Sequence, residues 1–152
     1  GGRLYSGSSF FAGTFGAIVT HPDERNSGQD ILSGCYEKYA STTALVRSAM
    51  EQDPSLSDGR AIFARLGETQ VKNLVDRWIT EITYGLTTII HMLNPACVIL
   101  GGGVMEQSYV LEEIRAKLYG NLVPPFRSVR IEKAALGNRA GMLGAAVLDQ
   151  KR

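Results

Sequence analysis

The segment from about Thr69 to Leu93 carries one continuous apolar stripe, which limits the possible folds more than any other part of the chain. Apolar residues recur there at steps of three and four, the spacing of one face of an α-helix. The stripe consists of Val71, Leu74, Val75, Trp78, Ile79, Ile82, Leu86, Ile89, Ile90 and Leu93. Asn94-Pro95 follows, and because a residue before proline avoids the helical region, the helix is expected to end there. The fold must therefore be built around one long helix that is largely buried.

A short apolar run comes soon after this helix. Residues 97–100, with the sequence CVIL, show no polar alternation and predict a strand buried on both faces, central in a parallel or mixed sheet. Residues 127–135 alternate apolar and charged side chains and predict a second strand nearer the sheet edge. Helices that alternate with strands define the α/β class.

The rest of the chain predicts shorter elements. Residues 17–20 are expected to form a strand, and the polar residues 21–33 a loop. A helix is expected over about 35–51, followed by a short helix that Ser57-Asp58 caps and Gly67 closes. Another helix is expected over about 110–119, broken by Gly120. A final helix over about 140–148 contains small residues that would let it lie very close to a neighbour.

Composition excludes several classes of protein. Hydrophobic residues make up 44% of the 152 residues, enough for a proper core, and the formal net charge is only +1. That charge does not favour nucleic-acid binding, and no apolar stretch approaches the length of a membrane span. Cys35 and Cys97 form no metal or disulfide pattern, which fits a reduced compartment. We expect a cytoplasmic protein, and because the chain opens at Gly1-Gly2 without a methionine, a piece of a longer one.

The glycines are the candidate chemical feature. Gly101-Gly102-Gly103 directly follows the predicted strand, and bare backbone there could face a nucleotide, although a tight strand-to-helix turn without a ligand is the more frequent reason for such glycines. The pattern is neither the dinucleotide fingerprint GxGxxG nor a P-loop. Glu37 fits the first turn of a helix, where a carboxylate is favoured by the helix dipole. His21 and His91 have no partner pattern, and Cys97 is expected in the core.

Three stretches in order resemble motifs of the ROK family (repressor, open reading frame, kinase). Residues 12–17, AGTFGA, are similar to the family's AGExGH segment, and residues 34–41, GCYEKYAS, to its GCLExYAS segment. Residues 94–104 and 140–146 resemble its NPxxIxLGGGV and AGLLGAA ending. The resemblance covers essentially the whole chain.

This resemblance implies that residues 1–152 are the C-terminal lobe of a sugar kinase with the actin-like ATPase (ribonuclease H-like) fold, with a mixed sheet and a long buried helix. Gly101, Gly102, Gly103 and Val104 would border ATP, while Glu37 and Thr14 would contact the sugar. The phosphate loop and the catalytic aspartate would belong to an N-terminal lobe, and Mg²⁺ would bridge the phosphates of ATP in the full-length protein, so this chain alone would be inactive. The family's dimers imply a homodimer.

Departures from the family pattern matter as well. Thr14 stands where kinases of the family have a sugar-binding glutamate, and Ala17 where they have a zinc-binding histidine. Gly28 and Asp30 occupy the positions of two zinc-binding cysteines. One thiol cannot hold a tetrahedral zinc, so we expect no structural zinc and a loop at 21–33 that is ordered by hydrogen bonds or mobile. In this respect the chain resembles the zinc-free β-glucoside kinase branch.

Two other functions fit the same residues. The chain could be the sugar-sensing lobe of a ROK-type transcriptional repressor without kinase activity, which would carry a helix-turn-helix upstream. It could also serve as an oligomerisation lobe, with Tyr84, Thr88 and His91 facing a partner. An upstream DxGGT loop would instead favour the kinase.

Overall fold

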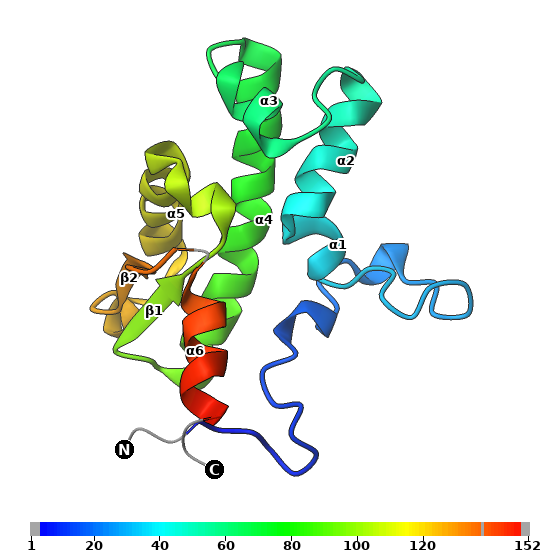
Figure 1. Ribbon diagram of the computed structural model, residues 1–152. Coiled ribbons are helices and arrows are strands. Elements are labelled where there is room, and N and C mark those ends of the chain that lie inside the picture. Colours follow the sequence, from blue (N-terminus) through cyan, green and yellow to red (C-terminus); the bar gives the residue numbers. More distant parts are fainter. Residues whose placement is uncertain (1–3, 138, 150–152) are drawn as a thin grey trace.

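The computed structural model describes residues 4–137 and 139–149, with side chains up to residue 146, so Gly1, Gly2 and the side chain of Leu148 lie outside the described part. The described residues are mostly helical, with a small parallel sheet (Figure 1). The helices and strands are α1 (Glu37–Ala40), α2 (Thr42–Gln52), α3 (Gly59–Ala64), α4 (Thr69–Leu93), β1 (Cys97–Leu100), α5 (Ser108–Asn121), β2 (Arg130–Lys133) and α6 (Arg139–Asp149). The described residues also contain four short 3₁₀ turns: η1 (Phe15–Ala17) and η2 (Pro22–Glu24) before α1, η3 (Gly103–Glu106) after β1, and η4 (Pro124–Phe126) after α5.

Helix α4 forms the axis of the structure and confirms the prediction from the apolar stripe. Helices α1 and α2 pack on one side of it, and α5 and the sheet lie on the other (Figure 1). Most of the stripe is buried, but Leu93 is 71% exposed and Ile89 only half-buried, because the last turn extends past the core. Asn94 ends the helix in the left-handed conformation, with φ 43°, which asparagine tolerates better than most residues.

The two strands pair in parallel, with Val98 opposite Ile131. The prediction that β1 is buried on both faces is wrong, since Ile99 is 67% exposed while Val98 and Leu100 pack against the core. Within the described residues β1 has only β2 as a neighbour, and helices cover one face of this pair. An all-apolar run gives no alternation from which this half-burial could have been read.

Two predicted elements differ at their bounds for local reasons. The helix expected over 35–51 is broken at Ser41, whose extended backbone (ψ 158°) begins α2 and whose Oγ accepts from the Ala44 N–H at 3.1 Å. The strand expected over 17–20 is wrong, because η1 occupies residues up to Ala17 and only Val19 forms a bridge, to Cys35.

Other short helices fit their predictions more closely. Asp58 caps α3 as expected, with its Oδ1 accepting from the Ala61 N–H at 2.8 Å, but α3 ends before Gly67 is reached. Helix α5 continues through Gly120 to Asn121, so that glycine does not break it.

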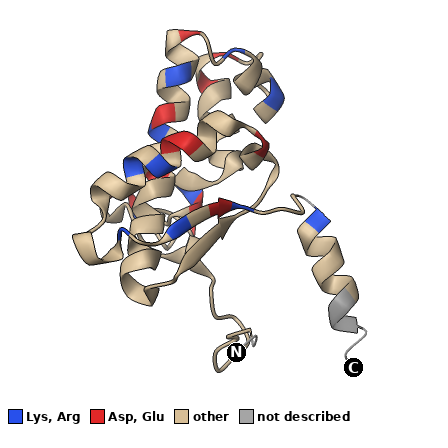
Figure 2. Ribbon diagram, turned by 90° about the vertical axis from the view of Figure 1, so that its left-hand side faces the viewer, with Lys and Arg blue, Asp and Glu red and all other residues tan. Residues whose placement is uncertain are grey.

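The prediction that the small residues of α6 let it lie very close to a neighbour is wrong for the part of the chain that the structure describes. Figure 2 shows the helix projecting from the rest of the chain. A Cβ at Gly141 or Gly144 would meet no atom within 4 Å, and Met142 is 69% exposed. In the described part of the chain, no helix combines the length and apolar character of a membrane span.

Candidate functional site

The backbone at the end of β1 forms an open glycine turn. Gly102 has φ +106°, a conformation that other residues rarely adopt, and a Cβ there would meet nothing within 4 Å. Gly101 and Gly103 are exposed, and the Met105 N–H donates to the Gly102 carbonyl at 3.1 Å. The buried Met105 side chain anchors η3 beneath the turn. No side chain of the described residues fills the space next to Gly102.

A hollow of about 570 Å³ lies beside this turn. Its two walls come from segments far apart in sequence: one from η3 and the residue after it, the other from α3 and the start of α2. Phe63 and Val104 contribute apolar surface, and Arg60 contributes a guanidinium. Such a hollow can hold a planar aromatic group with an attached anion. The lining residues are Gly103, Val104, Glu106, Gln107, Thr42, Asp58, Gly59, Arg60 and Phe63.

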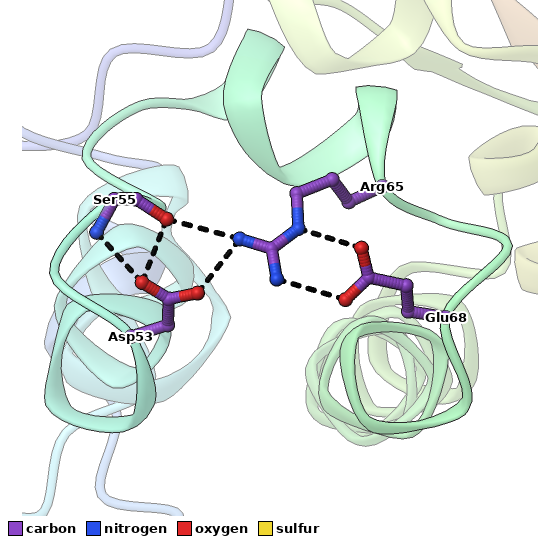
Figure 3. A network of polar contacts seen from close by, with 4 residues as sticks. All are labelled: Asp53, Ser55, Arg65 and Glu68. Atoms are coloured by element: carbon purple, nitrogen blue, oxygen red, sulfur yellow. Dashed lines mark hydrogen bonds and ion pairs between the residues drawn. The ribbon is translucent and has the colours of Figure 1, made fainter.

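A polar network fixes the wall of this hollow that α3 forms (Figure 3). The Arg65 guanidinium donates to both carboxylate oxygens of Glu68, at 2.7 and 2.8 Å, and to Asp53 Oδ2 at 2.7 Å. Hydrogen bonds from Ser55 and then from Arg65 lower the pKa of Asp53 to about 2. The network joins the C-terminal ends of α2 and α3 to the start of α4, and thereby sets where α3 stands.

The two residues predicted to contact a sugar lie on neighbouring segments. Glu37 begins α1 and is exposed, and a Cβ at Gly16 would stand 3.0 Å from its Oε2. Thr14, also exposed, precedes η1 and donates its hydroxyl to the Phe11 carbonyl at 2.8 Å. The fold therefore brings η1 and Glu37 together. Neither Thr14 nor Glu37 is among the residues that line the glycine-turn hollow, so the candidates form two separate surfaces.

Tyr36 and Gly85 position this second surface, and sequence reasoning missed both. The Tyr36 hydroxyl donates to the Ile82 carbonyl at 3.0 Å, and its ring packs edge-on to Phe15 with centroids 5.6 Å apart. A Cβ at Gly85 would overlap the Tyr36 ring. Burial, with a smaller contribution from the Glu81 charge, raises the pKa of Tyr36 to about 12. A glycine inside the long helical run was the available signal.

The loop over residues 21–33 is ordered by hydrogen bonds, the first of the two expected alternatives. Arg25 Nη1 donates to the carbonyls of Ile31 and Ser33, both at 2.7 Å, and to Cys35 Sγ at 3.2 Å. Asp30 pairs with Lys38 at 2.7 Å, and the hydrogen bond from Lys38 lowers its pKa.

These residues do not fit a zinc ion. A guanidinium already contacts the thiol of Cys35, and a cation there opposes a second one. No group of three His, Cys, Asp or Glu side chains in the described ranges is arranged to hold a metal.

The two histidines have structural contacts. The His21 ring stacks on Tyr39 with centroids 3.6 Å apart, and its Nε2 lies 3.6 Å from Glu81 Oε1. His91 accepts from the Val123 N–H at 3.3 Å, which ties α4 to the segment after α5. Cys97 is half-buried at the start of β1.

Comparison with known proteins gives one consistent result. The family model described as "ROK family" matches residues 1–152. The N-acetyl-D-glucosamine kinase of Yersinia enterocolitica is 28% identical over 97% of this chain and 52% of its own length. The ROK hexokinase structure from Thermus thermophilus superposes with a TM-score of 0.82 at 29% identity, over 100% of this chain and 53% of that one.

A further structure was solved with ligands. It is a ROK family glucokinase from Streptomyces griseus in complex with glucose and AMPPNP, with a TM-score of 0.81 at 29% identity over 96% of this chain and 54% of that one. This chain thus spans about half the length of the relatives that it matches.

Proposed function

Since this chain belongs to the ROK family, we propose that it is the C-terminal lobe of an ATP-dependent sugar kinase that phosphorylates a hydroxyl of a hexose or glycoside. The proposal draws on the relatives, which include an N-acetyl-D-glucosamine kinase and a hexokinase that are each about twice as long as this chain. The N-terminal lobe would supply the catalytic aspartate, so this lobe has no catalytic residue and is inactive alone.

The observation that carries the proposal is the open glycine turn that faces α3 across a hollow of about 570 Å³. Gly101, Gly102 and Gly103 leave their backbone accessible to phosphates, and Val104 and Phe63 offer apolar surface to a purine. The Streptomyces griseus glucokinase, whose structure this lobe resembles, was solved with AMPPNP. Mg²⁺ bound with ATP would neutralise the phosphate charge.

The second surface is proposed to contact the sugar. The exposed Glu37 carboxylate accepts hydrogen bonds, which suits the hydroxyl groups of a polyol. Thr14 already donates its hydroxyl hydrogen to Phe11, so it would offer lone pairs rather than a proton. Together, the Glu37 carboxylate and the Thr14 hydroxyl oxygen would accept hydrogen bonds from sugar hydroxyl groups. We propose further that the lobe works without structural zinc, as in the β-glucoside kinase branch, because Arg25 binds the thiol and carbonyls of the loop.

Nucleotide binding tests this proposal on the chain itself. AMPPNP with Mg²⁺, titrated into the chain, should shift NMR signals of η3 and α3. Gly102→Ala should weaken this binding about tenfold or more, because a side chain strains the backbone at φ +106°. Gly67→Ala is the matched control, since a Cβ there meets nothing within 4 Å and its φ is ordinary. Absence of any nucleotide-dependent shift, or equal effects of the two variants, would contradict the assignment.

Activity is tested on the complete protein. ATP, Mg²⁺ and a panel of hexoses and glycosides should yield a phosphorylated sugar, and Glu37→Gln should raise KM for the sugar more than KM for ATP. Failure to phosphorylate any sugar would exclude the kinase.

A sugar-sensing repressor lobe is the second candidate. Thr14 and Ala17 favour it, because neither residue carries the charge or the imidazole of the resembled motif. This lobe would then bind sugar without chemistry, and an upstream helix-turn-helix in the complete protein would distinguish it. In either case we propose a homodimer through the outer face of α4, where Tyr84 is 51% exposed. Sedimentation of the wild-type chain and of Tyr84→Arg would test it.

A further inference from the structure

A second hollow, of about 290 Å³, lies between α1, α2 and α4 and shares no lining residue with the glycine-turn hollow. Its floor is apolar and contains Leu45, Leu74 and Trp78, each at most 5% exposed. The Trp78 indole N–H already donates to the carbonyls of Ala40 and Ser41, at 3.1 and 3.0 Å. The floor therefore offers an aromatic and aliphatic surface but no free donor from this indole.

One wall holds a carboxylate oxygen that lacks a partner. Glu81 Oε2 is buried and accepts no hydrogen bond from any described residue, while Oε1 lies 3.6 Å from His21 Nε2. A buried carboxylate oxygen without a donor is unfavourable, because it loses its water without gaining a replacement. Since Oε2 is sealed from the hollow, a ligand hydroxyl would become its donor once the Glu81 carboxylate rotates toward the ligand.

The rim carries cations that retain free donors. Arg47 uses Nη2 to donate to the Lys38 carbonyl at 2.8 Å, which leaves most of its guanidinium N–H groups available. The Arg77 side chain forms no hydrogen bond or ion pair with another residue of the described ranges. Lys38 differs, because Asp30 neutralises it at 2.7 Å. Two guanidinium groups beside the hollow favour a phosphate, which they can bind in bidentate fashion.

We propose that this hollow binds a small phosphorylated polyol, with its phosphate on Arg47 and Arg77 and a hydroxyl donating to Glu81. A ligand with both groups fits better than either a plain anion, which Glu81 and Glu51 would repel, or a neutral sugar, which would leave the guanidinium groups unused. The volume lies near the lower end for small-molecule sites, which suits a single phosphorylated sugar ring.

The position of the hollow gives this site a regulatory consequence. Lys38 and Tyr39 line it and directly follow Glu37 in the short helix α1. A ligand that binds one arrangement of α1 more tightly than another would therefore shift the position of Glu37. By linkage, a sugar bound at Glu37 would change the affinity of the hollow for its ligand by the same factor. The product of the proposed kinase, a phosphorylated sugar, belongs to the same chemical class as the proposed ligand. The proposal for this hollow rests on its own geometry, however, and would apply equally to a sugar-sensing lobe without kinase activity.

Titration of the chain with glucose 6-phosphate tests the site by calorimetry and NMR. We expect binding with shifts in α1, α2 and α4, and at least tenfold weaker binding of inorganic phosphate alone and of glucose alone. The double variant Arg47→Gln with Arg77→Gln should weaken the binding of glucose 6-phosphate tenfold or more. Glu81→Gln should weaken the binding of glucose 6-phosphate but not the binding of inorganic phosphate. Arg130→Gln, an exposed arginine of β2, is the charge-matched control and should leave binding unchanged.

A steric variant keeps the test independent of charge. Ser48 lines the hollow, so Ser48→Phe should block binding while circular dichroism shows an intact fold. The proposal is overturned if glucose 6-phosphate fails to bind at 10 mM, or if Glu37→Gln abolishes binding while the double arginine variant does not. If the chain binds glucose 6-phosphate but not AMPPNP, the kinase proposal is contradicted and the proposal for this hollow is not.

Discussion

The ring of Tyr36 occupies the space in which a side chain at Gly85 would stand. This contact joins the start of α1 to the middle of α4, and the hydrogen bond from Tyr36 to the Ile82 carbonyl reinforces it. Glu37 follows Tyr36 directly, so the missing side chain at Gly85 helps to set where the candidate sugar-binding carboxylate lies.

Gly85→Ala should destabilise the chain, although alanine is favoured over glycine inside a helix by about 1 kcal/mol. The added methyl group overlaps the Tyr36 ring, and overpacking of this kind costs about 1–3 kcal/mol. Urea denaturation measures the difference. Gly120→Ala in α5 is the control, because a Cβ there meets no atom within 4 Å. This substitution should stabilise the chain slightly. In a Tyr36→Ala background the penalty of Gly85→Ala should disappear; a penalty that persists would show that the ring is not its cause.

Arg25→Met should release the loop over residues 21–33. The guanidinium donates to two carbonyls and to the Cys35 thiol, and a thioether side chain can replace none of these bonds. Cys35 is 1% exposed, so its reaction with a thiol reagent should become at least several times faster in the variant. Cys97, half-buried in β1 and outside the loop, is the internal control in the same sample and should react at an unchanged rate. Equal acceleration at both cysteines would mean that Arg25 supports the whole fold rather than the loop.

Sequence reasoning succeeded where one periodic pattern determined one element. The stripe from Val71 to Leu93, with Asn94-Pro95 after it, predicted α4 and its bounds, and Asp58 predicted the cap of α3. It failed where the decisive partner is far away in the chain. The wall that α3 forms opposite Gly103, and the Tyr36 ring over Gly85, depend on tertiary contacts that no local pattern encodes. Ile99 could not be predicted as exposed for a different reason: an apolar residue in an all-apolar strand does not indicate which face of the sheet is covered.

Asp53→Asn should make stability less dependent on pH in the acid range. The folded state lowers the pKa of Asp53 to about 2, from about 3.9 in an unfolded chain, through hydrogen bonds from Ser55 and Arg65. A lowered pKa contributes stability that is fully present above pH 4 and is lost as the pH falls toward 2. Melting temperature measured from pH 6 to pH 2 should therefore fall less steeply in Asp53→Asn than in the wild type. Asp23→Asn, in η2, is the control and should follow the wild-type curve; identical slopes for all three proteins would exclude a role for the network in Figure 3.

Substitutions on the two faces of the sheet test the finding that β1 is covered on one side. Ile131→Thr should cost about 2–3 kcal/mol, because this side chain is 1% exposed and the hydroxyl would enter the core without a partner. Ile99→Thr should cost less than about 0.5 kcal/mol, because Ile99 is 67% exposed and threonine retains the β-branched shape that strands favour. Chemical denaturation of both variants gives the two values, and sedimentation at the same concentrations shows whether the chain remains a monomer under the conditions used. A large cost for Ile99→Thr in a monomeric chain would show that the outer face of β1 is buried after all, whereas a cost that appears only in an associated form would place Ile99 in the contact between copies.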